Sequence, residues 1–230
     1  MKMIWGYIKN YKQALNPVVF LWSASFMAVL IYLNYSVHLE QILTGNQYLP
    51  LPGFTGHLLL FAGCFLIPYL ITGLYSNHSY LANSSFWLLA AAAVIIFSIK
   101  VSGDIQVTLP GKAPVYMYWN KILYWPVRLL FIITSLYFLR RYCAVPFYGL
   151  SLKKTTLYPY FIMLAMMIPL IGFASTQPDF LLMYPKLKTV TPYLPEALPP
   201  FLSKLLFELS YGSDFISIEL FFRGFLIFSF

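Results

Sequence analysis

The chain has 230 residues, of which 60% are hydrophobic and 10% are charged, and its mean hydropathy is +0.73. Because soluble domains carry charge on about a quarter of their residues, this composition excludes an ordinary soluble domain and favours a polytopic membrane protein. The net charge of +8 does not indicate a nucleic-acid partner, since Lys and Arg lie in short segments between apolar runs, as charges that orient membrane proteins do.

The first residues predict an interfacial segment followed by a membrane span. Residues 1–16 carry Lys2, Lys9 and Lys12 among aromatic side chains. The apolar run at 18–35 is longer than the core of a signal peptide, so we expect an uncleaved first span.

Four further apolar runs follow, and each is near the ~20 residues that a helix needs to cross the hydrocarbon core. A last run begins near residue 212 and is still apolar at Phe230, so we expect that span to be cut off there. The predicted fold class is an all-α polytopic membrane protein with about five full transmembrane helices and a truncated sixth. The four runs cover roughly 57–75, 84–101, 122–139 and 157–174.

The positive charges predict the orientation. The N-terminal lysines and the cluster Arg140, Arg141, Lys153 and Lys154 both lie on the inside if the chain crosses the membrane four times between them. The first loop, 36–56, has no Lys or Arg, as expected outside. We therefore expect a multi-pass protein of the cell (inner) membrane with a cytoplasmic N-terminus.

Prolines and cysteines inside or beside the spans are possible markers of a site. Pro68, Pro126 and Pro169 each remove a backbone donor, and the resulting kinks either border cavities or are ordinary features of membrane helices. Cys64 and Cys143 have no ligand-type spacing. We expect two unpaired thiols, and neither a metal nor a cofactor.

A proline-rich stretch precedes the last run. Pro199-Pro200 is typical of a helix start, and the apolar spacing after it predicts a short interfacial helix at 199–210. We expect a flexible link at Tyr211-Gly212-Ser213 after this helix. The predicted divisions are 1–174 for the N-terminal transmembrane helices, 175–210 for the proline-rich loop and interfacial helix, and 211–230 for the start of a functional core.

The last apolar run contains the candidate site, Glu219 and Arg223. The two residues are four apart, so on a helix they share a face and can pair. Charges at membrane depth are costly and are by default a functional hypothesis. Glu219 suits a general base that takes a proton from water, with Arg223 orienting it. The alternative is a structural ion pair that fastens two helices.

The amino-acid sequence of this run is similar to a known motif. Glu219-Leu220-Phe221-Phe222-Arg223-Gly224-Phe225-Leu226 resembles the first motif, Glu-Glu-x-x-x-Arg, of the CAAX-protease and bacteriocin-processing (CPBP, Abi) family. Phe147-Tyr148-Gly149-Leu150, followed by Lys153-Lys154, resembles the segment that precedes that family's core. The resemblance implies an intramembrane glutamate protease without a required metal, with Glu219 and Arg223 as catalytic residues. It also implies membrane lipid around the protein and a lipidated or membrane-embedded peptide substrate.

Two departures accompany the resemblance. Ile218 stands where the family has its first glutamate, and the family's later histidine motifs would follow residue 230. His38, His57 and His78 match no family position, and we expect them to be structural. We therefore expect the chain as it stands to be inactive. The missing glutamate leaves three interpretations of the complete protein: Glu219 takes over its role, the subfamily works differently, or the protein is an inactive relative. The alternatives to a protease are a non-catalytic scaffold that binds a membrane partner, or a transporter subunit with Glu219 as a proton relay.

Two other charged residues, Asp214 and Arg128, have interpretations that do not involve catalysis. Asp214, five residues before Glu219, lies off the Glu219 face and is expected to mark the start of the last span. Arg128 either reaches a carboxylate within the bundle or extends to the membrane surface near Trp125 and Lys121.

Overall fold

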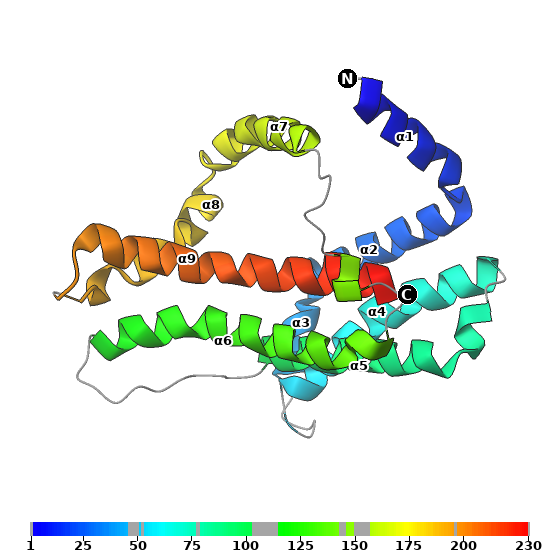
Figure 1. The fold of residues 1–230 in the computed structure, drawn as a ribbon, viewed down its shortest axis with the longest axis horizontal. Helices are drawn as coiled ribbons and strands as arrows, with labels where there is room; N and C mark the ends of the chain where they lie inside the picture. Colours follow the sequence, from blue (N-terminus) through cyan, green and yellow to red (C-terminus); the bar gives the residue numbers. More distant parts are fainter. Residues whose placement is uncertain are drawn as a thin grey trace. The chain divides into compact units, whose positions relative to one another are not determined.

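The computed structural model describes residues 2–45, 51, 53–76, 79–102, 115–142, 146–149, 157–195 and 197–229, and all their regular secondary structure is helical (Figure 1). Expectations on Cys143, His78, Leu150, Lys153 and Lys154 lie outside these residues. The chain divides into two compact units, each described by itself. The first unit is Met1–Asp104, Tyr137–Val145 and Leu226–Phe230, and the second is Ile105–Leu136 and Pro146–Phe225.

Four helices among the described residues are long and apolar enough to cross a membrane: Pro17–Val37, Phe54–Tyr75, Ser84–Ser102 and Tyr116–Tyr142. They confirm the predicted all-α, multi-pass membrane character. The fifth apolar run forms a shorter helix of 17 residues, Tyr158–Ala174, and its role as a span stays a prediction. The same holds for the truncated sixth span, whose apolar run is interrupted by Asp214, Glu219 and Arg223.

The first unit begins with two helices whose ends follow from local sequence. α2 starts at Pro17, and the side chain of Asn16 caps it by accepting a hydrogen bond from the backbone N–H of Val18 at 3.0 Å. His38, with φ of 54°, ends α2 and starts α3. The helices of this unit are α1 (Lys2–Ala14), α2 (Pro17–Val37), α3 (Leu39–Thr44), α4 (Phe54–Ser76), η1 (Ser79–Ala82) and α5 (Ser84–Ser102), followed by the turn η2 (Arg140–Tyr142).

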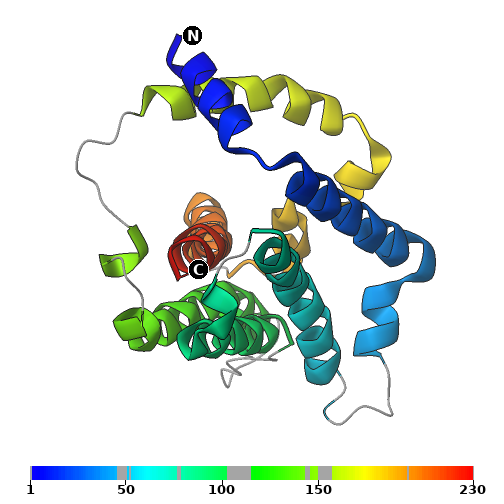
Figure 2. The ribbon, with the colours of Figure 1, turned by 90° about the vertical axis from the view of Figure 1, so that its right-hand side faces the viewer.

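α4 and α5 lie side by side (Figures 1 and 2). Phe97 of α5 meets Phe61 of α4 edge to face, with ring centroids 4.8 Å apart. The buried Ala90 and Ala93 keep the facing side of α5 small, which lets two membrane helices approach closely. The turn η1 between them is held by Tyr80, whose hydroxyl donates to the backbone carbonyl of Tyr69 at 2.7 Å.

Tyr80 predicts a loss of stability at high pH. Burial raises the pKa of Tyr80 above its ordinary value of 10.0. The stabilisation that the Tyr80 hydrogen bond gives the fold is therefore complete below about pH 10. It is lost as the pH rises through the raised pKa, because the phenolate can no longer donate to the carbonyl of Tyr69. We expect wild type to unfold at a higher temperature than Tyr80→Phe at neutral pH, and this difference to shrink above about pH 10. A difference that is constant across this range would contradict the assignment.

The second unit is built mainly from two long helices. They are α6 (Val115–Leu139), whose last residues belong to the first unit, and α9 (Pro200–Glu219), which continues as the π-helix η6 (Leu220–Leu226). Leu226 and the short helix α10 (Ile227–Ser229) that follows belong to the first unit. The predicted helix start at Pro199-Pro200 is confirmed. The shorter elements are η3 (Pro146–Gly149), α7 (Tyr158–Ala174), α8 (Pro178–Met183), η4 (Lys186–Thr189) and η5 (Thr191–Tyr193).

α6 and α9 run alongside each other (Figures 1 and 2), and their contact forms the core of the second unit. The buried hydroxyl of Tyr118 donates to the carbonyl of Ser203 at 2.6 Å, and the hydroxyl of Ser210 donates to the carbonyl of Ile122. Phe207 packs against the ring of Trp125 with centroids 5.4 Å apart. The buried face of α9 and η6 repeats a small residue at every seventh position: Ser203, Ser210, Ser217 and Gly224.

Two expectations about this region were wrong. Tyr211-Gly212-Ser213 is not a flexible link, because α9 passes through it without a break. A glycine in a helix costs at most about 1 kcal/mol, and the packed residues Ser210 and Ser217 on either side outweigh it. The stretch 175–200 is also more regular than expected, since it contains α8, η4 and η5.

Candidate functional site

The predicted pairing of Glu219 and Arg223 is confirmed. Arg223 Nε lies 3.0 Å from Glu219 Oε2, within hydrogen-bond distance. The Glu219 side chain is 52% exposed and the Arg223 side chain is 75% exposed, so the pair does not lie in the core of its unit. Arg223 holds one carboxylate oxygen of Glu219 and leaves the carboxylate accessible from outside.

The pair spans the start of the π-helix η6. Glu219 is the last residue of α9, and Arg223 lies in the π-helical Leu220–Leu226. Short π-helical segments within α-helices are often found at functional sites. The opposite side of this segment is anchored, because Phe221, Gly224 and Phe225 are buried. The helix therefore presents its charged pair on one side and is packed on the other.

Tyr148 anchors the packed side of η6. It adopts a left-handed backbone with φ of 56°, and its buried hydroxyl donates to the carbonyl of Leu136 at 2.5 Å. Its ring meets Phe225 edge to face with centroids 5.8 Å apart. A Cβ atom on Gly224 would lie 3.4 Å from the Cβ of Tyr148, so the backbone of the motif packs directly on this tyrosine. Tyr148 thereby fixes the position of the segment that carries Arg223.

Asp214 takes a different place from the one expected, and Arg128 contacts a neighbour on its own helix. Asp214 does not mark a helix start, because it lies inside α9, where its carboxylate accepts a hydrogen bond from the Ser217 hydroxyl at 3.1 Å. The guanidinium of Arg128 stacks on the ring of Tyr124, 3.8 Å from its centroid, which is a cation–π contact within one face of α6.

The described histidine and cysteine side chains belong to the first unit. His57 Nδ1 lies 2.7 Å from the carbonyl of Gly53, in keeping with a structural role, and His38 forms the junction of α2 and α3. Cys64 is a free thiol. Across the described ranges, no group of three or more His, Cys, Asp or Glu side chains is arranged to hold a metal ion.

Two features of the helices were not predicted from the sequence. Tyr148 belongs to the segment 147–150 that resembles the family, but its contact with Gly224 and Phe225 depends on tertiary packing that no local pattern indicates. Ser98 and Lys100 of α5 are buried, with the Lys100 ammonium 5.7 Å from the ring centroid of Phe97. A lysine at the end of an apolar run was the available signal for the second feature.

The chain matches no known family model, no curated protein and no solved structure. The four candidate spans indicate a multi-pass membrane protein.

Proposed function

We propose that this chain carries the first catalytic motif of an intramembrane glutamate-type endopeptidase of the CAAX-protease and bacteriocin-processing kind. The observation that carries the proposal is the 3.0 Å contact between Glu219 and Arg223, which lie within the otherwise apolar sequence of residues 219–226. The N-terminus would lie in the cytoplasm, and the substrate would be a lipidated or membrane-embedded peptide.

The exposure of the pair supports this role. A charged pair on a helix between large apolar side chains such as Phe215 and Ile227 is costly against lipid, so its outer side calls for water or protein. Water is the second reactant in peptide hydrolysis. The accessible carboxylate of Glu219 is therefore in a position to meet it.

The chemistry assigned to Glu219 is general-base catalysis. The carboxylate takes a proton from a water molecule as the oxygen of that water adds to the peptide carbonyl. The proton then passes to the departing amine as the carbon–nitrogen bond breaks, which regenerates the carboxylate. Arg223 stays charged throughout and orients the carboxylate through its 3.0 Å contact.

Ile218 favours a second candidate function, a non-catalytic relative that binds a membrane partner. The position before Glu219 carries an apolar side chain where the resembled motif has a glutamate. In this alternative the single carboxylate holds a cation of the partner, and the two functions differ in whether a peptide bond is broken.

The proposal is tested by measuring whether the complete protein, as its gene encodes it, cleaves a fluorogenic membrane peptide in vesicles. We expect cleavage by wild type, because Glu219 provides the base, and no requirement for a glutamate at position 218. The variant Ile218→Glu is the discriminating comparison. Cleavage by this variant together with an inactive wild type would contradict the proposal and support the non-catalytic relative.

A further inference from the structure

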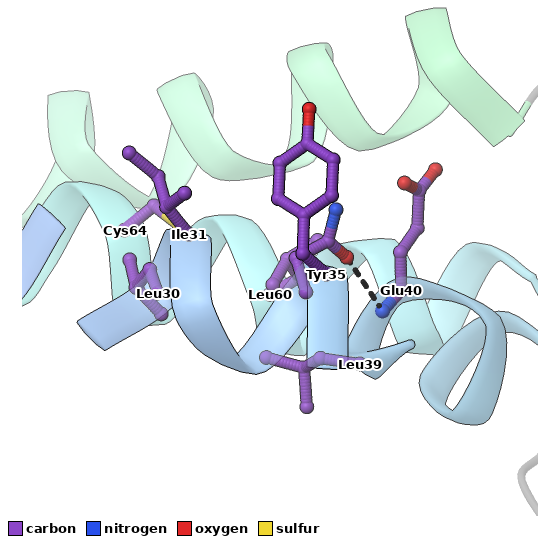
Figure 3. Close-up of a pocket in the computed structure, with 8 residues that line it drawn as sticks. Leu30, Ile31, Tyr35, Leu39, Glu40, Leu60 and Cys64 are labelled. Atoms are coloured by element: carbon purple, nitrogen blue, oxygen red, sulfur yellow. Dashed lines mark hydrogen bonds between the residues drawn. The ribbon is translucent and has the colours of Figure 1, made fainter. Parts of the chain in front are cut away.

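The first unit contains an open groove between α2, α3 and α4 that is distinct from the Glu219–Arg223 pair. Its volume is about 220 Å³. Figure 3 shows Leu30, Ile31 and Cys64 toward one end and Glu40 at the other, with Tyr35 between them. The groove is therefore apolar at one end and acidic at the other.

The acidic end has a defined local structure. The backbone N–H of Glu40 donates to Asn34 Oδ1 at 3.2 Å, which ties the first turn of α3 to the end of α2 (Figure 3). The side chains of Tyr35 and Glu40 point to the same side in this view. The Glu40 side chain is 56% exposed, and His57 Nε2 lies 4.0 Å from Glu40 Oε1, beyond hydrogen-bond distance. The carboxylate thus has room for a ligand donor.

The charge of the groove selects the ligand. Glu40 is the single charged side chain among its lining residues, in a chain with 15 Lys and Arg against 7 Asp and Glu. An anionic headgroup would be repelled there, whereas an ammonium would form a charge-assisted hydrogen bond to the carboxylate. The apolar lining by Leu30, Ile31 and Leu60 calls for a hydrocarbon chain on the same ligand.

The size and setting of the groove indicate a lipid. Pockets for whole small molecules span about 300–1,000 Å³, so about 220 Å³ holds only part of an amphiphile. α2 and α4 are both candidate membrane spans, so the remainder of the molecule would lie in the bilayer.

We propose that this groove binds a phospholipid with a primary ammonium headgroup, phosphatidylethanolamine. One acyl chain lies along Leu30, Ile31 and Leu60, and the ammonium donates to the Glu40 carboxylate. Phosphatidylcholine has no N–H donor in its headgroup, so it loses this hydrogen bond. Phosphatidylglycerol is anionic and meets the carboxylate unfavourably.

Photo-crosslinking in vesicles of a phosphatidylcholine host tests the proposal. The protein is reconstituted with phosphatidylethanolamine, phosphatidylcholine or phosphatidylglycerol probes that carry the same photoreactive acyl chain, and crosslinks to α2 and α4 are mapped by mass spectrometry. We expect the ethanolamine probe to label this groove most strongly. Since exposed ion pairs contribute about 0.2–1 kcal/mol, Glu40→Gln is expected to lower labelling about 1.4- to 5-fold.

Two variants make the result specific. Leu60→Trp fills part of the apolar lining and is expected to lower labelling by all three probes. Replacement of Glu208, an exposed glutamate on α9, by Gln is expected to leave labelling unchanged. The headgroup comparison in wild type stands even if a variant fails to fold. Equal labelling by the three probes in wild type, or undiminished ethanolamine labelling in folded Glu40→Gln, would overturn the proposal and leave an ordinary lipid-facing surface.

Discussion

Replacing Glu219 by Gln is expected to lower peptide hydrolysis by the natural protein about 10²–10⁴-fold, the usual contribution of general acid–base catalysis. Gln keeps the size of the side chain and removes its capacity to take a proton. Because the Glu219 side chain is 52% exposed, the substitution leaves the packing of α9 against α6 intact. The measurement is the rate of cleavage of a membrane peptide in vesicles.

Glu208→Gln is the matched control for this experiment. Glu208 is also an exposed glutamate of α9, eleven residues before Glu219 and outside the motif. We expect it to retain the wild-type rate. Arg223→Lys is expected to fall between the two, because Lys keeps the charge but lacks the planar guanidinium that orients a carboxylate. Wild-type cleavage by Glu219→Gln would remove Glu219 from the reaction.

Replacing Gly56 by Ala is expected to destabilise the first unit by about 1–3 kcal/mol, the usual cost of overpacking a core. A Cβ atom on Gly56 would lie 2.2 Å from the carbonyl oxygen of Leu43 and 2.8 Å from the backbone nitrogen of Thr44. These are backbone atoms of the α3 end, so no side-chain rotation relieves the clash. The measurement is the midpoint of unfolding in detergent.

Gly63→Ala, on the same helix, separates packing from helix propensity. A Cβ atom on Gly63 would meet nothing closer than the Ile67 Cδ1 atom at 4.0 Å. Ala favours a helix over Gly by up to about 1 kcal/mol, so propensity alone stabilises both variants. We expect Gly63→Ala to be neutral or stabilising and Gly56→Ala to be destabilising. A stabilised Gly56→Ala would show that α3 does not pack on α4 as described.

The features that were predictable from sequence are those that depend on neighbouring residues. Apolar runs gave the four candidate spans because hydropathy over about 20 residues is a local property. The pairing of Glu219 with Arg223 followed from their spacing, and the helix start at Pro200 followed from the fixed backbone of proline.

The features that were not predictable depend on contacts distant in sequence. Gly212 predicts a break in the helix, yet α9 continues through it because Ser210 and Ser217 are held in packed positions. Similarly, the left-handed Tyr148 under Gly224 joins residues far apart in the chain, and no hydropathy pattern encodes that contact. The groove at Glu40 depends on how α2, α3 and α4 pack together, so it too was missed.

Reading the gene beyond the codon for Phe230 tests the proposed protease motif most directly. The proposal predicts an open frame with further apolar spans, the first bearing a histidine and a later one bearing a histidine with an asparagine one helical turn on. These residues would complete the site begun by Glu219 and Arg223. A stop codon directly after Phe230, or following spans without histidine, would contradict the protease and leave Glu219–Arg223 as a structural ion pair.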